Sequence, residues 1–313
     1  MTSFSELFAA VRTRRESGDF AGALALFEGR ESDFALQKGL VFLVRAELLT
    51  ELAQPDRAID SLDAALASGC RYKRSWLDEN PRLSALRGSP RFREVTERSA
   101  RRYEEDSAAA RPELTLVMPA GAAPPAGYPL LVALHGNNST MSDTVGYWSS
   151  PARAGWVVAV PQSSEIGVSP GAFTWNETER TVREVTAHIR EIGKRTQLDP
   201  DRVVMGGFSM GGLQAIALPL TARIRARAFI AVAAWLPTIG EFATMLDRGP
   251  GRDLSGYIVV GGRDPSCDGA KQLVALLVRH RVRAELDLRD DLGHEYPPDM
   301  PQTLSRAMAF MSA

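Results

Sequence analysis

The pattern of hydrophobic and polar positions changes near residue 110. Before that point, hydrophobic residues recur at steps of three and four, as on one face of an α-helix. The series Leu40, Leu43, Val44 and Leu48 illustrates this spacing. After that point, short hydrophobic runs alternate with amphipathic stretches. The pattern therefore predicts an all-helical region followed by a region in which strands and helices alternate.

The helical region, residues 1–108, contains a weak internal repeat. Residues 18–27 align with residues 53–62, which places Ala58 at the position of Ala23. Tetratricopeptide repeats have a period of about 34 residues and carry small residues where paired helices cross. The region resembles one and a half to two such repeats, although a generic helical bundle has the same spacing. Because about three repeats are needed for independent stability, we expect this domain to dock on the rest of the chain.

An acidic and then alanine-rich stretch ends at Pro112 and marks the predicted start of a second domain, residues 112–313. Its candidate strands are short and mostly hydrophobic: residues 113–118, 129–134, 156–160, 202–206, 228–233, 257–260 and 284–288. Such strands alternating with helices predict an α/β fold with a mostly parallel sheet covered on both faces. In these sheets, ligands bind beyond the carboxyl ends of the strands. The search for chemistry therefore narrows to the loops that follow strands.

The strongest local signal is Gly207-Phe208-Ser209-Met210-Gly211, which follows a candidate strand and opens a candidate helix. A serine nucleophile in this position sits on a sharp turn, where side chains two residues to either side would collide. Glycine at positions 207 and 211 removes those collisions. The start of the following helix also contributes positive potential where an oxyanion forms. The segment therefore predicts Ser209 as a nucleophile.

Partners for this serine follow later strands. Asp264 comes directly after strand 257–260, and His294 lies in the loop after strand 284–288. Asp268, Asp290 and Asp291 compete for the acid role; we prefer Asp264, with Asp268 as the next candidate, because Asp264 lies directly after the strand. The order Ser, Asp, His is the one expected of a nucleophile on this kind of turn.

The other three histidines have different expected roles. His188 lies in an amphipathic helix before the nucleophile, and His280 ends a basic helix. His135 ends strand 129–134 and precedes Asn137, in the loop expected to supply a second oxyanion N–H group. We expect His135 to hold this loop by hydrogen bonds.

These segments together resemble a compact α/β-hydrolase, closest to the phospholipase/carboxylesterase and dienelactone-hydrolase-like group. The matching pieces are Leu134-His135-Gly136, Pro161-Gln162, Gly206 to Gly212, Gly262-Arg263-Asp264 and Gly293-His294. Two departures stand out. The dienelactone hydrolases use a cysteine nucleophile where this chain has Ser209, and the helical front is not part of the minimal family fold.

The resemblance implies a serine esterase that works through an acyl-enzyme intermediate. In that mechanism Ser209 attacks the acyl carbonyl, His294 transfers the proton, and Asp264 orients the imidazole. The backbone N–H groups of Met210 and Asn137 are implied as the oxyanion hole. Such a triad requires no metal ion and no cofactor, and the chain lacks the spacing of metal, dinucleotide and phosphate-loop motifs.

Three tryptophans are candidate substrate contacts. Trp148, Trp175 and Trp235 lie in or near segments that follow strands, on the side where the site is expected. Aromatic side chains there can line a pocket for an acyl or aryl group. Ordinary packing of large hydrophobic residues explains each of them equally well.

The amino-acid composition limits the classes of partner and the cellular compartment that we expect. The chain has 313 residues, of which 44% are hydrophobic and 24% charged, with a net charge of −1. This balance favours neither nucleic acid nor an anionic membrane as partner. Two cysteines, Cys70 and Cys267, exclude a disulfide framework and a thiolate-rich zinc site. With no signal-peptide pattern and no run of 18 apolar residues, we expect a cytoplasmic protein that acts on a small-molecule ester.

Two further hypotheses compete with the esterase. A serine peptidase on the same fold would need acidic residues to hold the substrate amine, and Glu165, Glu177 and Glu179 are the candidates. Alternatively, the hydrolase half is a scaffold, and the helical front binds a protein partner or mediates self-association. The glycines that permit the sharp turn argue against an inactive scaffold.

Overall fold

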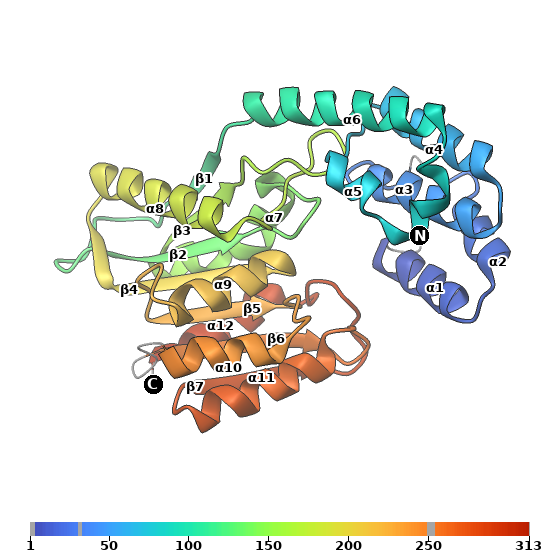
Figure 1. The fold of residues 1–313 in the computed structure, drawn as a ribbon. Helices are drawn as coiled ribbons and strands as arrows, with labels where there is room; N and C mark the ends of the chain where they lie inside the picture. Colours follow the sequence, from blue (N-terminus) through green and yellow to red (C-terminus); the bar gives the residue numbers. More distant parts are fainter. Residues whose placement is uncertain (1–3, 31–32, 249–253, 313) are drawn as a thin grey trace. The chain divides into compact units, whose positions relative to one another are not determined.

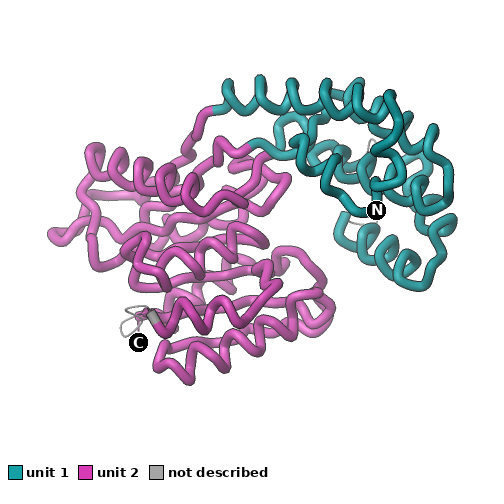
Figure 2. The backbone as a smooth tube through the Cα atoms, in the orientation of Figure 1, with its two compact units in different colours: residues 1–110, 166–172 teal, residues 111–165, 173–313 magenta. Residues whose placement is uncertain are grey.

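The computed structural model describes residues 4–30, 33–248 and 254–312 (Figure 1). The chain forms two compact units (Figure 2). Unit 1 contains residues 1–110 and 166–172, and unit 2 contains residues 111–165 and 173–313. None of the described helices has the length and apolar character needed to cross a membrane.

All of the regular secondary-structure elements in the described part of unit 1 are helices. Its elements are α1 (Phe4–Glu16), α2 (Phe20–Ala25), α3 (Lys38–Glu51), α4 (Pro55–Ala67), α5 (Arg74–Asp78), the 3-10 helix η1 (Pro81–Leu86) and α6 (Pro90–Ala109). The repeat-related positions Ala23 and Ala58 are both completely buried. However, α2 has 6 residues whereas α4 has 13, so the two aligned helices are unequal. The tetratricopeptide assignment stays a prediction.

A short segment from the middle of the chain belongs to unit 1. Val168 joins the hydrophobic core formed by α3, α4 and α6, and its carbonyl accepts a 3.0 Å hydrogen bond from the Arg71 N–H. The hydroxyl of Ser169 accepts a 2.9 Å hydrogen bond from the Gly39 N–H. Sequence periodicity did not predict this insertion, because it is a loop without a repeating pattern. The change of unit at residue 110 lies two residues beyond the predicted end of the helical region.

Unit 2 contains all seven strands that the sequence predicted. They are β1 (Glu113–Val117), β2 (Tyr128–Leu134), β3 (Val157–Gln162), β4 (Leu198–Phe208), β5 (Ala228–Val232), β6 (Ser255–Gly261) and β7 (Arg283–Arg289). They form one sheet in the order β1-β3-β2-β4-β5-β6-β7. Among the described strands of this sheet, only the β1–β3 pair is antiparallel. The predicted α/β architecture with a mostly parallel sheet is confirmed.

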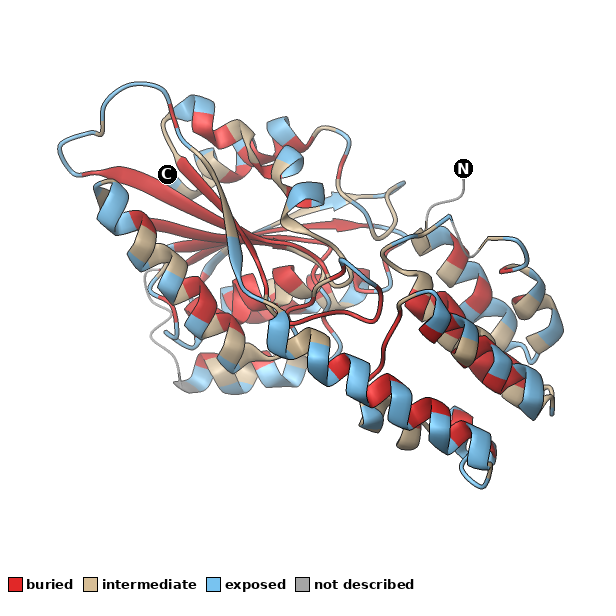
Figure 3. Cartoon of the chain, turned by 90° about the horizontal axis from the view of Figure 1, so that it is seen from above, coloured by how far each residue is buried: buried red, intermediate tan, exposed pale blue. Residues whose placement is uncertain are grey.

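Helices cover both faces of this sheet, because the strand side chains alternate between two hydrophobic cores (Figures 1 and 3). Leu130, Val132 and Leu134 face one core, whereas Leu131 and Ala133 face the other. The first core is closed by α8 (Thr178–Arg195), α9 (Met210–Leu220), α10 (Ile239–Arg248) and α11 (Cys267–Arg279). The second is closed by α7 (Met141–Trp148), the 3-10 helix η2 (Ser150–Ala154) and α12 (Met300–Ser312). With both faces occupied, side chains for chemistry are left to the strand ends.

Candidate active site

Ser209 occupies a sharp turn between β4 and α9. Its backbone has φ 54° and ψ −119°, a left-handed region that a residue with a side chain rarely adopts. A Cβ atom on Gly207 would lie 2.2 Å from the Gly211 carbonyl oxygen, and one on Gly211 would lie 2.4 Å from the His135 carbonyl oxygen. Both glycines of the motif are therefore required by the close approach of backbone. The surrounding structure stabilises this strained backbone conformation of Ser209.

A continuous chain of hydrogen bonds connects the three predicted triad residues. His294 Nε2 lies 2.9 Å from Ser209 Oγ, and His294 Nδ1 lies 2.8 Å from Asp264 Oδ2. The Asp264 side chain is fully buried, whereas that of His294 is 24% exposed. The second carboxylate oxygen of Asp264 accepts a 2.7 Å hydrogen bond from the Ser266 N–H. Because this carboxylate only accepts, His294 carries its proton on Nδ1 and offers Nε2 as the acceptor for the Ser209 hydroxyl.

The rival residues lie elsewhere. Asp268 pairs with Lys271 on the surface, and Asp291 pairs with Arg263 while remaining 96% exposed. His280 ends α11 near Asp247. His188, on α8, is half-buried, and this burial lowers its pKa. The structure thus brings only one of the candidate acids and one of the candidate histidines to Ser209.

The loop after β2 lies directly beside the turn that carries Ser209. A Cβ atom on Gly136 would be 3.5 Å from the Cβ of Ser209. The Asn137 side chain is held at both ends, since its amide donates to Asn176 Oδ1 at 2.7 Å and its oxygen accepts from the Trp175 N–H at 3.1 Å. Met210 is the first residue of α9, so its N–H has no acceptor within that helix. The two predicted oxyanion donors therefore belong to segments that flank the serine.

His135 holds the loop after β2 in place by hydrogen bonds. Its ring is completely buried, and this burial lowers its pKa to about 4, although a hydrogen bond to Gly136 opposes the shift. The neutral ring donates from Nδ1 to the Gly136 carbonyl at 2.7 Å. Its Nε2 accepts from the side-chain amide of Gln162 at 3.0 Å and from the Ser163 N–H at 3.3 Å. The expected hydrogen-bonding role of His135 matches these contacts.

The three tryptophans fall into two groups. Trp148 and Trp175 are completely buried, so neither offers surface to a substrate. Trp148 packs beneath β4, where a Cβ atom on Gly206 would meet its ring at 2.6 Å. Trp235 is different, because it is 43% exposed. Its backbone N–H donates to the Ser209 carbonyl at 3.0 Å. Of the three expected substrate contacts, only Trp235 has an exposed surface.

An aromatic stack next to His294 was missed by sequence reasoning. Tyr147, on α7, stacks on Tyr296 with ring centroids 3.9 Å apart, and Tyr296 stacks on Phe208 at 4.3 Å. The Phe208 ring lies 5.2 Å from the His294 ring. Tyr147 is 43% exposed at the outer end of this stack. A tyrosine next to a buried tryptophan on a short helix is the only sequence signal, and it is too general to identify this surface.

Within the described residues, no group of three or more His, Cys, Asp or Glu side chains is arranged to hold a metal ion. The groups that lie together at the site are the serine, the imidazole, the carboxylate and the adjacent backbone N–H groups.

Comparison with known proteins agrees with this chemistry. Residues 167–312 match the family described as phospholipase/carboxylesterase. Among solved structures, an uncharacterised protein from Bacillus cereus ATCC 10987 is 22% identical with a TM-score of 0.55, over 99% of this chain and 98% of that chain. Esterase PE8 is 17% identical with a TM-score of 0.52, over 64% of this chain and 99% of that one.

Est1E from Butyrivibrio proteoclasticus is 13% identical with a TM-score of 0.50, over 65% of this chain and 95% of that one. A search of curated proteins found no match. The structural likenesses at these identities show the fold, and the family match adds the class of reaction. Residues 167–312 are thus similar to the phospholipase/carboxylesterase family, and the carboxyl-terminal unit has the α/β-hydrolase fold, which together indicate an ester-hydrolysing serine hydrolase.

Proposed function

We propose that the protein cleaves carboxylic esters through Ser209, His294 and Asp264, with an acyl-enzyme intermediate on Ser209. One observation carries the proposal. The Ser209 hydroxyl, both nitrogens of His294 and the buried Asp264 carboxylate form two successive hydrogen bonds of 2.9 and 2.8 Å. Nucleophile, base and orienting acid thus lie in the geometry that activates a hydroxyl.

In the first half-reaction, Ser209 Oγ forms a bond to the ester carbonyl carbon while its proton passes to His294 Nε2. The tetrahedral intermediate then expels the alcohol, which takes that proton. In the second half-reaction, His294 removes a proton from water, water attacks the acyl carbon, and Ser209 leaves as the hydroxyl with the proton returned. Asp264 stays ionised throughout and stabilises the imidazolium that forms twice per turnover.

Oxyanion stabilisation is assigned to the N–H groups of Met210 and Asn137. Both flank Ser209, one at the first turn of α9 and the other in the loop fastened by His135. Backbone donors that are already in place need not reorganise as charge develops on the carbonyl oxygen. Each such donor typically contributes about 3–4 kcal/mol to stabilisation of the transition state.

For the substrate, we propose contact with Trp235 and with the exposed edge of Tyr147. Both residues are 43% exposed, and both are linked to the segments that carry Ser209 or His294. Trp235 reaches the Ser209 carbonyl through its backbone N–H, and Tyr147 reaches Phe208 and His294 through Tyr296. These flat surfaces favour an ester with a hydrophobic or aromatic group on at least one side of the bond.

The peptidase hypothesis receives less support, because its three acidic candidates already have partners. Glu165 is 2% exposed and accepts a hydrogen bond from the Glu177 N–H. The Glu177 carboxylate pairs with Arg180, and that of Glu179 pairs with Arg223. A substrate amine would have to displace a cation or enter a closed site. Assays with a nitrophenyl ester and an aminoacyl anilide distinguish the two activities.

A fluorophosphonate probe tests the proposal, because it labels only a serine that has been activated as a nucleophile. The wild-type protein should be labelled, and Ser209→Ala should not. With a nitrophenyl ester, Ser209→Ala or His294→Ala should lower kcat by roughly a million-fold, as in other triads. Labelling that survives in Ser209→Ala, or a loss of only ten-fold, would assign the reaction to other residues.

For unit 1, we propose an interaction surface, either for a protein partner or for a second copy of the chain. Stacked helix pairs offer extended faces of this kind. The molecular mass of the full-length protein in solution, measured over a range of concentrations, tests self-association. A monomer mass at every concentration would exclude self-association, and a different protein would remain as the proposed partner.

A further inference from the structure

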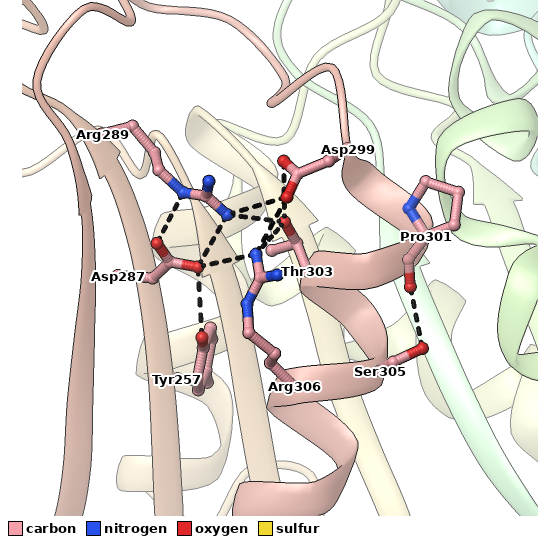
Figure 4. Close-up of polar contacts among 8 residues, drawn as sticks. All are labelled: Tyr257, Asp287, Arg289, Asp299, Pro301, Thr303, Ser305 and Arg306. Atoms are coloured by element: carbon pink, nitrogen blue, oxygen red, sulfur yellow. Dashed lines mark hydrogen bonds and ion pairs between the residues drawn. The ribbon is translucent and has the colours of Figure 1, made fainter.

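His294 lies in a loop whose two ends are joined by ion pairs. The loop leaves β7 at Arg289 and enters α12 at Met300. Arg289 Nη2 lies 3.3 Å from the carboxylate of Asp299, the last residue before α12 (Figure 4). The guanidinium is itself held from the strand side, since its Nε lies 2.6 Å from Asp287 Oδ1. The loop is therefore closed at its base by a bond between its two ends.

Asp299 is the only acid of this cluster on the α12 side of the loop (Figure 4). Besides Arg289 it contacts Arg306, at 3.1 Å, and its second oxygen accepts from the Thr303 hydroxyl at 3.3 Å. Partial burial acts to raise the pKa of Asp299, but the hydrogen bond from Arg306 and the charge of Arg289 together lower it. The carboxylate thus stays charged and paired at neutral pH.

The middle of the loop is fastened to the segment that carries Asp264. The Gly262 N–H donates to the Arg289 carbonyl at 2.8 Å, and the Arg263 N–H donates to the Leu292 carbonyl at 3.0 Å. On the far side of His294, the Tyr296 ring is stacked between Tyr147 and Phe208. The return to α12, where Asp299 lies, is held by the ion pairs, by a 3.1 Å hydrogen bond from Arg289 to the Thr303 hydroxyl, and by a 2.9 Å hydrogen bond from the Thr303 N–H to the Asp299 carbonyl.

We propose that Asp299 is a positioning residue, which keeps the His294 imidazole aligned with Ser209 by closing the base of this loop. The inference rests on the proposed function of His294. Proton transfer depends steeply on alignment, and a displacement of about 1 Å can cost roughly 100-fold in rate. Because the other contacts of the loop persist without Asp299, we expect a smaller loss, of roughly ten-fold.

Loss of Asp299 should not unfold the unit. Asp287 still joins β7 to α12 through Arg306, at 3.4 Å, and to β6 through the Tyr257 hydroxyl, at 3.1 Å. The substitution therefore removes the Asp299 ion pairs from the base of the loop, while the Arg289–Thr303 hydrogen bond of 3.1 Å and the Asp287–Arg306 pair still connect the strand and the helix.

The test compares Asp299→Ala, Asp299→Glu and Asp291→Ala in the full-length protein. Asp291 is the matched control, because it lies in the same loop and is 96% exposed. Asp299→Ala should lower both kcat for a nitrophenyl ester and the fluorophosphonate labelling rate by roughly ten-fold, with KM unchanged. Asp299→Glu should recover most of that loss, and Asp291→Ala should match the wild type.

The proposal is overturned if Asp299→Ala has the kcat of Asp291→Ala, or if its loss appears in KM alone. Thermal unfolding identifies a variant that is not folded at the assay temperature, in which case Asp299→Asn, with the same shape, takes its place. A wild-type protein that does not react with the probe would instead contradict the proposed function. The two failures are therefore distinguishable.

Discussion

At the scale of single residues, His135 shows how burial converts a titratable side chain into a structural one. The ring is fully buried and holds the loop that carries Asn137 by three hydrogen bonds. Two of these bonds require Nε2 to accept, so protonation of the ring would break them. The loop therefore depends on a neutral His135.

This dependence predicts a loss of stability in acid. The pKa of His135 is about 4 in the folded protein, against about 6.5 when unfolded. Between these values the unfolded chain binds the proton and the folded chain does not. The contribution, on the order of 3 kcal/mol, is therefore fully present above pH 6.5 and is lost as the pH falls towards 4.

Urea unfolding at several pH values between 4 and 7 measures this effect, with His135→Gln as the variant that lacks the titration. The difference in unfolding free energy between wild type and variant should shrink as the pH falls, because other groups titrate alike in both. Parallel curves would contradict the assignment of a neutral, buried His135.

At the scale of elements, the proposed triad depends on how closely neighbouring strand-ending loops approach each other. A Cβ atom on Gly261, the last residue of β6, would lie 2.1 Å from the Leu292 carbonyl oxygen and 2.5 Å from that of Gly293. These atoms are backbone, directly preceding His294, and they cannot move without moving the loop. Glycine at position 261 therefore allows the Asp264 and His294 segments to meet.

We expect Gly261→Ala to displace His294 and to reduce kcat for a nitrophenyl ester by roughly 100-fold, as for a 1 Å misplacement of a reacting group. Gly193→Ala is the control. Gly193 lies in α8 with nothing within 4 Å of an added Cβ, so alanine there should leave kcat unchanged. It should also stabilise the helix by about 1 kcal/mol, which thermal unfolding would detect. Wild-type kcat in Gly261→Ala would show that the loop tolerates the displacement.

At the scale of the whole molecule, the division into units does not follow the chain. Residues 166–172 lie between β3 and α8 in sequence, yet Val168 completes the core of the helical unit. The helical unit is therefore not a separate amino-terminal module that can be removed without consequence. The Bacillus cereus structure matches this chain over 99% of its length, so the likeness spans both units.

Truncation of Val168 tests this division. Val168→Ala should destabilise the helical unit by about 1–3 kcal/mol through lost burial and the cavity left behind. Hydrogen exchange should then speed up in α3 and α4, while the central strands of unit 2 keep their protection. Val278→Ala is the control, because that valine is 56% exposed. Unchanged hydrogen-exchange rates in α3 and α4 would show that Val168 does not stabilise the helical core.

The sequence by itself determined the elements and the order of the chemistry. All seven strands were predictable because five contain a continuous hydrophobic run, whereas β1 and β7, at the two edges of the sheet, alternate hydrophobic and polar residues. The proximity of Ser209, Asp264 and His294 was predictable because each follows a strand, and parallel strands end at one edge of the sheet. The glycines around Ser209 added a steric requirement that is visible in five consecutive residues.

Only the tertiary structure decided which side chains face a substrate and which hold the site together. Trp148 and Trp235 both lie near strand ends, yet one is completely buried and the other is 43% exposed. The Arg289–Asp299 pair and the place of Val168 join positions that no periodicity connects. Local pattern reports whether a residue prefers burial, but the identity of its neighbours depends on how distant segments pack, which the folded chain alone settles.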